Sequence, residues 1–267
     1  ASPAAQPNPY QTFEKWGQLP AGRTWGSTNA VDVAPNGHVW VAERCGANTC
    51  AGSNLAPILE FDPSGKLLRS FGAGVLIFPH GFHVDREGNV WVTDAQGRDG
   101  KGHQVFKFSP DGKLLLTLGK AGVAGAANDE LNQPSDVAVA PNGDIFVADG
   151  HDEDSNARIG KFSKTWGKRG KGPGEFDTPH GLAFDSRGRL FVSARGNNRI
   201  QVSLRLKNHG KSRVAGLVLS DTFSPADAFP HASSARDFRV LAEDASDQRF
   251  EWTTGTSLEP GETKTFT

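Results

Sequence analysis

A repeat of about fifty residues constrains this chain more than any other feature of its sequence. Five segments share one pattern, in which an alternating strand, a turn and a second strand follow each other. They start at Thr28, Phe78, Gln133, Thr178 and Phe229. By subtraction, the starts lie 50, 55, 45 and 51 residues apart, and the fifth segment is the weakest match. Such self-similarity at a steady period predicts a repeat architecture.

The turns inside the repeat indicate what each unit is. Asn-Gly occurs at 36–37 and 142–143, and these residues tolerate the positive φ that tight hairpin turns require. Two repeats continue into a second hairpin, at 58–72 and 105–119, so each unit is expected to hold four short antiparallel strands. Such units fit the blades of a β-propeller, because radial packing buries both faces of a small sheet. A β-sandwich, the alternative, does not repeat a whole four-stranded unit at a steady period.

The chain is therefore predicted to be all-β, a propeller of five to six four-stranded blades whose last blades are degenerate. Residues 1–24 are expected to form an N-terminal extension and residues 25–202 the clear blades. Residues 203–267 lose the pattern and are expected to form degenerate blades or an appended β segment that closes the ring. Six blades need about 300 residues at this period, so a five-bladed or distorted ring stays open as an alternative.

Composition excludes several kinds of partner. The 29 basic and 30 acidic residues nearly cancel, which leaves no electrostatic footprint for nucleic acid and no basic face for anionic lipid. No apolar run approaches the roughly 20 residues that span a bilayer. The N-terminus begins with small residues and prolines and lacks Met, which is typical of a chain after signal-peptide removal and equally of a trimmed chain. The expected location is secreted or periplasmic.

The only two cysteines, Cys45 and Cys50, lie five residues apart. In an oxidising compartment they would close a small loop as a disulfide, whereas in a reducing one they would be free thiols. Two thiols alone leave a zinc site incomplete, so a cysteine zinc site is disfavoured.

Several motifs in the repeats match a known family. They are PHGFHVDREGNVWVTD (79–94), QVFKFSPDGK (104–113), QPSDVAVAPNGDIFVADG (133–150), GPGEFDTPHGLAFD (172–185) and RGNNRIQV (195–202). On these motifs the chain resembles the NHL-repeat β-propellers, and within them peptidyl-α-hydroxyglycine α-amidating lyase, which completes peptide C-terminal amidation. The resemblance covers roughly residues 25–202. Many NHL proteins share these motifs, so they specify the propeller more strongly than the lyase.

The resemblance implies a catalytic zinc held by three histidines, each after a proline at the head of a blade. His80 and His180 match, and His231 has the right local form but lies 51 residues after His180, about one blade where the family has two. Blade heads converge on the central channel, where imidazoles can bind zinc and leave an open fourth position. Alternatively, Pro-His is merely a frequent start of a blade. A structural calcium ion is implied by the resemblance alone.

The resemblance also implies roles for two arginines and for residue 151. Arg44 matches the arginine that binds the substrate carboxylate, a task that suits the rigid fork of donors on a guanidinium. Arg195 matches a second arginine near the channel. Where the family has a catalytic tyrosine this chain has His151, and its only tyrosine is Tyr10. A histidine there could act as a base or add a metal ligand, or it could mark the loss of amidating activity.

Two functions are carried forward. The first is a zinc-dependent lyase that cleaves a C–N bond in a small carboxylate-bearing or peptide substrate, giving a peptide amide and glyoxylate. The second is a non-catalytic propeller whose channel mouth binds a protein or a ligand. Hydrolysis of a lactone or glycan ranks last, because the blade heads offer histidine rather than Asp or Glu.

Overall fold

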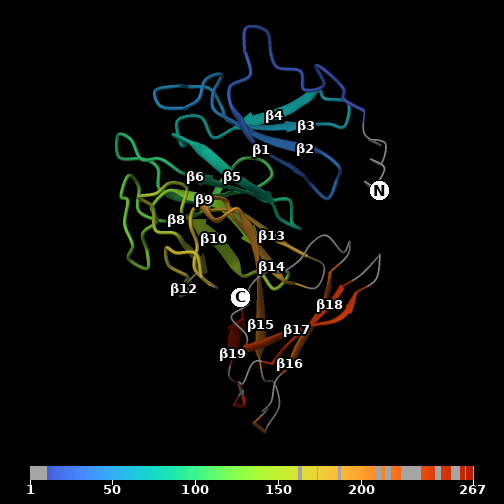
Figure 1. The fold of residues 1–267 in the computed structure, drawn as a ribbon. Coiled ribbons are helices and arrows are strands. Elements are labelled where there is room, and N and C mark those ends of the chain that lie inside the picture. Colours follow the sequence, from blue (N-terminus) through green and yellow to red (C-terminus); the bar gives the residue numbers. More distant parts are fainter. Residues whose placement is uncertain are drawn as a thin grey trace.

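The computed structural model describes residues 11–161, 164–172, 174–185, 188–207, 212–213, 218–223, 236–243, 248–253, 259–261 and 263–266. Within these ranges all regular elements are β-strands except one short 3-10 helix, Arg195–Asn197 (Figure 1). The prediction of an all-β chain is confirmed. No helix in these ranges is long and apolar enough to cross a membrane.

Four antiparallel sheets of four strands follow each other along the chain. Blade 1 holds β1 (Thr28–Val33), β2 (Val39–Glu43), β3 (Ile58–Phe61) and β4 (Leu67–Phe71). Blade 2 holds β5 (Pro79–Val84), β6 (Val90–Asp94), β7 (Gln104–Phe108) and β8 (Leu114–Leu118). Blade 3 holds β9 (Pro134–Val139), β10 (Ile145–Asp149), β11 (Arg158–Lys161) and β12 (Lys164–Trp166). Blade 4 holds β13 (Pro179–Phe184), β14 (Leu190–Ala194), β15 (Arg199–Lys207) and β19 (Thr263–Phe266).

The last strands depart from the simple repeat. In blade 4, β19 pairs with Leu204–Lys207 of β15, beyond the part of β15 that pairs with β14. A separate three-stranded sheet has the order β16 (Val218–Phe223), β18 (Gln248–Thr253), β17 (Arg236–Glu243). The propeller blades predicted from the repeat are thus present, whereas a total of five to six blades stays a prediction.

The turn chemistry explains the hairpins at the start of each blade. Gly37 and Gly143, the second residues of the two Asn-Gly pairs, have φ values of 81° and 83°. Glycine adopts this left-handed backbone without the steric cost that a Cβ would impose. The tight turns let each inner strand pair at once with the next strand, which fixes the position of every blade head.

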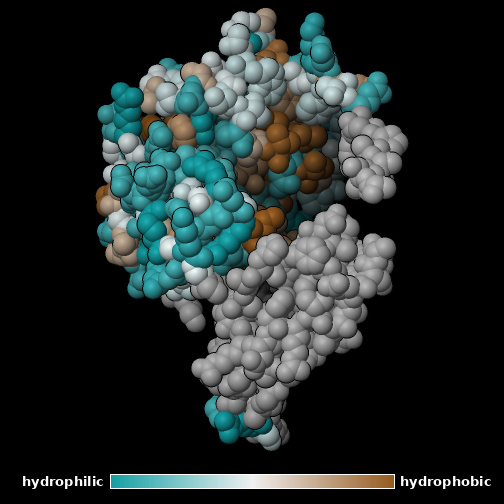
Figure 2. Space-filling model, viewed as in Figure 1, coloured by the Kyte–Doolittle hydropathy of each residue, from teal (hydrophilic) through white to brown (hydrophobic). Residues whose placement is uncertain are grey.

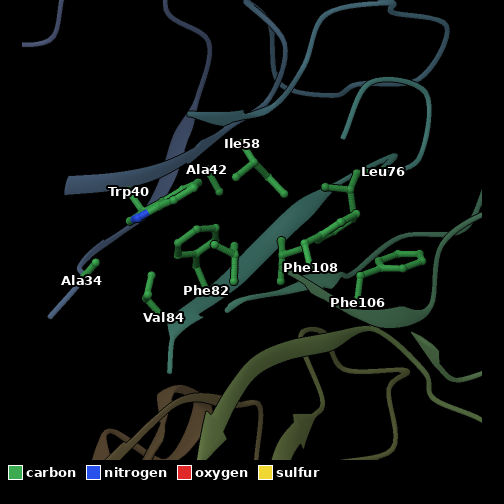
Figure 3. Close-up of a cluster of buried hydrophobic side chains, with 11 residues drawn as sticks. Ala34, Trp40, Ala42, Ile58, Leu76, Phe82, Val84, Phe106 and Phe108 are labelled. Carbon is green, nitrogen blue, oxygen red and sulfur yellow. The ribbon is translucent and has the colours of Figure 1, made fainter. Parts of the chain in front are cut away.

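Apolar cores lie between successive blades. Trp40 and Ile58 of blade 1 pack with Phe82 and Val84 of blade 2 (Figure 3). Equivalent clusters join blade 2 to blade 3 and blade 3 to blade 4. The inner strands β1, β5, β9 and β13 contact each other in that order. Burial of apolar area between the blades is therefore the force that brings the blade heads together.

Candidate metal centre

The second residue of each inner strand forms the blade head, and the hairpin register makes these residues equivalent. The residue before each head pairs with the end of the next strand: Thr28 with Glu43, Pro79 with Asp94, Pro134 with Asp149 and Pro179 with Ala194. In every blade the register then shifts, so that the head residue has no cross-strand partner. The heads are Asn29, His80, Ser135 and His180. A β-bulge of this kind re-aims a side chain, here at the same point of each blade.

Two blade heads and one loop residue bring three imidazoles together. The ring centroids of His80 and His180 lie 4.8 Å apart. His151, just after β10, lies 4.4 Å from His80 and 5.5 Å from His180 between ring centroids. One ligand nitrogen from each ring lies within 4.8 Å of the others. Across the described ranges, this is the only group of three or more metal-ligating side chains.

Hydrogen bonds fix the tautomers of two of these histidines. His80 Nδ1 lies 2.7 Å from the carbonyl oxygen of Ser135. His151 Nδ1 lies 3.0 Å from Oδ1 of Asp152. Carbonyl and carboxylate oxygens accept hydrogen bonds, so each Nδ1 carries the hydrogen and each Nε2 keeps a free lone pair. Such contacts from Nδ1 orient histidines that bind metals through the other nitrogen.

The surroundings keep all three imidazoles neutral. Burial, followed by the neighbouring His151 and despite the hydrogen bond to Ser135, lowers the pKa of His80 to about 3. Burial and then the charge of Arg195 lower the pKa of His180 to about 4. Burial also lowers the pKa of His151. Neutral imidazole is the form that binds a metal ion, so at neutral pH the three histidines are ready ligands.

This donor set fits zinc. Three imidazole nitrogens are a known ligand set of catalytic zinc sites, which keep a fourth position for water or substrate. The rings come from two blade heads and a loop of a third blade. Among the described residues, no group donates a hydrogen bond to any of the three rings, so their remaining nitrogens can bind a metal ion.

Arg44 follows β2 directly and is buried beside this cluster. Its guanidinium carbon lies 3.4 Å from the centroid of the Phe78 ring, and that ring stacks on His80 at 6.4 Å between centroids. Nε donates to the carbonyl of Pro79 and Nη1 donates to Oδ1 of Asn48. No carboxylate of the described chain forms an ion pair with it, and burial lowers its pKa to about 10. A buried cation without a counter-ion is a binding site for an anion.

The disulfide predicted from the two cysteines is present and holds this arginine loop. Cys45 is bonded to Cys50 and no cysteine is free. Beyond the bond, the backbone N–H of Cys50 donates to the carbonyl of Ile77 at 2.8 Å, and Thr49 Oγ1 donates to the same oxygen. The loop after Arg44 is thereby tied to the segment that carries Phe78 and His80.

Arg195 occupies the position in blade 4 that Arg44 occupies in blade 1, directly after the second strand. Its side chain is more than half exposed, and Nη2 donates to the carbonyl of His151 at 3.0 Å. Oδ1 of Asp152 lies 4.0 Å from the same nitrogen. Arg195 therefore holds the loop of His151 against blade 4 from the rim of the site.

Asp136 was not anticipated from the sequence, although it stands next to a blade head. Its Oδ2 accepts a hydrogen bond from the N–H of Leu182 at 2.8 Å, and its carboxylate also accepts from the N–H of Phe82. These two residues lie two places after His180 and His80. Burial raises the pKa of Asp136 to about 7. One carboxylate of blade 3 thus ties together the two strands that carry the metal-site histidines.

The same packing explains the glycine of the first Pro-His-Gly motif. A Cβ at Gly81 would collide with the backbone of Asp136 and with the carbonyl oxygen of Ser135. The glycine is required because blade 3 approaches the strand of His80 so closely. The sequence signal that could have identified Asp136 is its place after Ser135, which aligns with His80 and His180.

The structure brings together five of the six residues predicted to form the site: Arg44, His80, His151, His180 and Arg195. The sixth, His231, lies outside the described residues, so its role as a ligand stays a prediction. His151 was expected to take part in catalysis, and the geometry places it among the potential metal ligands.

Comparisons with known proteins agree with the repeats seen in the fold. The NHL repeat matches residues 131–162 and 176–202, in blades 3 and 4. NHL repeat-containing protein 3 of Homo sapiens is 36% identical over 189 residues, which cover 66% of this chain and 52% of that protein. Peptidyl-glycine alpha-amidating monooxygenase of Mus musculus is 40% identical over 159 residues, 54% of this chain and 15% of that protein.

A third relative is peptidyl-alpha-hydroxyglycine alpha-amidating lyase 1 of Drosophila melanogaster. It is 39% identical over 183 residues, which cover 61% of this chain and 32% of that protein. The chain thus spans about half or less of the length of these relatives. It is an NHL-repeat β-propeller that resembles the amidating lyases.

Proposed function

We propose that this chain binds zinc at His80, His151 and His180 and cleaves a C–N bond in a small substrate that carries a carboxylate. By resemblance to the amidating lyases, the substrate is a peptide ending in α-hydroxyglycine and the products are a peptide amide and glyoxylate. One observation carries the proposal: three neutral imidazoles converge beside a buried guanidinium that has no counter-ion among the described residues.

The reaction is balanced without an oxidant or reductant. The hydroxyl of the substrate loses its proton, its oxygen forms the C=O bond of glyoxylate, and the C–N bond breaks. The electron pair of that bond and one proton go to the nitrogen, which leaves as the amide. Zinc, when bound, would supply Lewis-acid chemistry that lowers the pKa of the hydroxyl.

The residues of the chain would position the substrate. Arg44 would hold the carboxylate, and its contacts with Phe78, Asn48 and Pro79 keep the guanidinium in place before the substrate binds. Arg195, at the rim, would keep His151 in position through its carbonyl. Preorganised donors of this kind stabilise charge that develops during a reaction.

The location of the protein and a second metal ion belong to the same proposal. The disulfide is supported by the structure and fits a secreted or periplasmic protein, where such bonds persist. A structural calcium ion is proposed from the resemblance alone, and the only metal-ligand group in the described ranges is the histidine cluster.

The alternative is a propeller that binds a ligand or a protein at the channel mouth without catalysis. It is favoured by one observation, the presence of His151 where the lyases have a catalytic tyrosine. If His151 binds the metal, it does not serve as the base of the reaction. The non-catalytic alternative therefore predicts the same metal content as the lyase proposal but no catalytic activity.

Metal analysis of the purified protein tests the proposal. We expect about one zinc ion per chain, and loss of zinc in His80→Ala, His151→Ala and His180→Ala. His83→Ala is the matched control, because His83 lies on the same strand as His80 but faces Asp32 of blade 1. Unmutated protein without stoichiometric zinc would overturn the proposal. Zinc without glyoxylate release from a model α-hydroxyglycine peptide would leave the binding alternative.

A further inference from the structure

A buried acidic residue ends the second strand of blades 1, 2 and 3, whereas blade 4 has alanine at this position. Glu43, Asp94 and Asp149 are each 0% exposed, and Ala194 is 1% exposed. The four positions are equivalent, because each of these residues pairs with the first residue of the inner strand of its blade. Blade 4 therefore lacks a buried carboxylate that the other three blades have in common.

Each of the three carboxylates accepts a hydrogen bond from the same backbone position. The donor is the N–H group of the residue two places before the inner strand. The pairs are Gly26 with Glu43 at 3.0 Å, Ile77 with Asp94 at 3.0 Å and Asn132 with Asp149 at 2.7 Å. In blade 4 this N–H group belongs to Asp177, and it has no acceptor among the described residues.

Blade 3 shows which side chains surround such a carboxylate. Oδ2 of Asp149 accepts hydrogen bonds from Nε of Arg158 at 2.8 Å and from Nδ2 of Asn156 at 2.7 Å. The two terminal nitrogens of Arg158 donate to the carbonyls of residues 126, 127 and 130. Asn156 Nδ2 also donates to the carbonyl of Gly125. The carbonyls thus fix both side chains, and each keeps one N–H group for the carboxylate.

Blade 4 repeats this arrangement around Ala194. The terminal nitrogens of Arg199 donate to the carbonyls of residues 171, 172 and 175, which by subtraction lie 45 residues after those that Arg158 contacts. Asn197 Nδ2 donates to the carbonyl of Gly170, again 45 residues after Gly125. The remaining contact has no counterpart, because Nε of Arg199 is buried and has no hydrogen-bond partner.

Burial makes this free donor on Arg199 significant. Figure 2 shows mainly hydrophilic residues over the part of the molecule where β8, β10 and β12 lie in Figure 1, and water hydrates polar groups at such a surface. Nε of Arg199 is not part of the surface. A buried donor without an acceptor loses the free energy of its hydration, and an unobserved ion is one of the explanations for such a group.

The charges around Ala194 favour an anion. Arg199 forms no ion pair within the described part of the chain. The carboxylate of Asp177 lies against Gly196, where a Cβ would collide with it, and its Oδ1 is 2.8 Å from Nη1 of Arg169. The carboxylate of Glu175 pairs with a lysine, Lys168, at 3.1 Å. Both neighbouring acids therefore have cationic partners of their own, and the guanidinium of Arg199 keeps its positive charge uncompensated.

We propose that blade 4 binds a small monovalent anion, of the size of formate or chloride, between the methyl group of Ala194 and the N–H donors of Asp177, Asn197 and Arg199. An aspartate side chain differs from that of alanine by one carboxylate group, so the ligand has the size of that group. The anion would link the segment before β13 to the loop after β14, as Asp149 links the corresponding segments of blade 3.

Ala194→Asp tests the proposal by supplying the carboxylate as a side chain. We expect the midpoint of thermal unfolding of the full chain, measured at low ionic strength, to rise by about 2–4 °C. Ala194→Asn is the matched control, because it has nearly the same shape without the charge and should not raise the midpoint. An Ala194→Asp protein that is no more stable than Ala194→Asn overturns the proposal, because the donors would then not converge on this position.

Titration with sodium formate and, separately, with sodium chloride tests the ligand itself. A ligand of the folded state raises the unfolding midpoint as its concentration increases, so we expect a rise for the unmutated protein with at least one of the two salts. Ala194→Asp should lack this response, because its own carboxylate fills the position. Sodium gluconate, whose anion is too large to fit, controls for ionic strength.

Equal responses of the unmutated protein and Ala194→Asp, or a rise of the same size with gluconate, overturn the proposal. Arg44 is present in both proteins, so an anion bound there affects both midpoints alike and cancels in the comparison. The result therefore does not depend on the proposed lyase function.

Discussion

At the scale of the residue, the site depends on which nitrogen and which charge each side chain presents. The carbonyl of Ser135 and the carboxylate of Asp152 set the tautomers of His80 and His151. Burial sets their charge: the imidazolium of His80 would lose its hydration without gaining a counter-ion, and at His151 burial outweighs the opposing effect of Asp152. Arg44 keeps its charge and lacks an acidic partner in the described chain, which leaves an anion as its natural ligand.

Arg44→Lys should weaken carboxylate binding and leave zinc content unchanged. Lysine keeps the charge, but it lacks the several N–H donors with which the guanidinium can contact Pro79, Asn48 and a carboxylate at the same time. Loss of one charge-assisted hydrogen bond predicts a KM raised by about tenfold or more. Glyoxylate release, followed as a function of peptide concentration, gives KM and kcat, and zinc analysis of the same sample is the control. An unchanged KM would contradict the role of Arg44.

Zinc binding should be nearly independent of pH between about 7 and 5.5. An ordinary histidine, with a pKa of 6.5, takes up a proton in this window and loses affinity for zinc. Here burial holds the pKa of His80 near 3 and that of His180 near 4, so protons compete only at lower pH. Competition with a zinc chelator at the two pH values measures the difference. A loss of affinity beginning near pH 6.5 would show that these imidazoles are not shielded.

At the scale of the element, a bulge at each blade head and one cross-blade carboxylate position the site. The bulge frees the head residue from the ladder, and Asp136 sets the spacing of β5 and β13 through Phe82 and Leu182. The repeat predicts the hairpins, the turns and the equivalence of His80 and His180. It does not predict Asp136, because that contact is made between strands about fifty residues apart in sequence.

Asp136→Asn should lower zinc affinity by about tenfold, because the amide has one oxygen to accept hydrogen bonds from backbone N–H groups where the carboxyl group has two. Titration with zinc measures the affinity, and thermal unfolding shows whether the fold persists. Asp32→Asn is the matched control, since Asp32 makes its cross-blade contacts with the N–H of Val84 and with His83, which is not one of the metal-site histidines. Equal zinc affinity in both variants would reduce Asp136 to a purely structural residue.

At the scale of the whole molecule, apolar side chains of the described residues are buried where successive blades pack on each other. The contribution of an isoleucine to the free energy of unfolding therefore depends on whether a following blade packs on it. Ile159→Ala should lower the free energy of unfolding by about 2–5 kcal/mol, because Ile159 fills a core between blades. Ile200→Ala should change it by less than about 0.5 kcal/mol, because Ile200 is 68% exposed. Urea unfolding measures both free energies, and a large effect of Ile200→Ala would show that Ile200 is buried in solution.

The sequence by itself determined the architecture of this protein, because period, alternation and turn chemistry are local properties of the chain. It also placed His80 and His180 at blade heads, whereas the roles of Arg44 and Arg195 came from the family resemblance and the pairing of Cys45 with Cys50 was one of two alternatives. Only the tertiary structure decided which side chains meet. His151 joins His80 and His180 because a loop of blade 3 reaches these two blade heads, and Asp136 ties their strands because blades 2, 3 and 4 pack in sequence. Local sequence patterns do not determine the distances between residues of different blades, because those distances depend on the apolar packing between the blades.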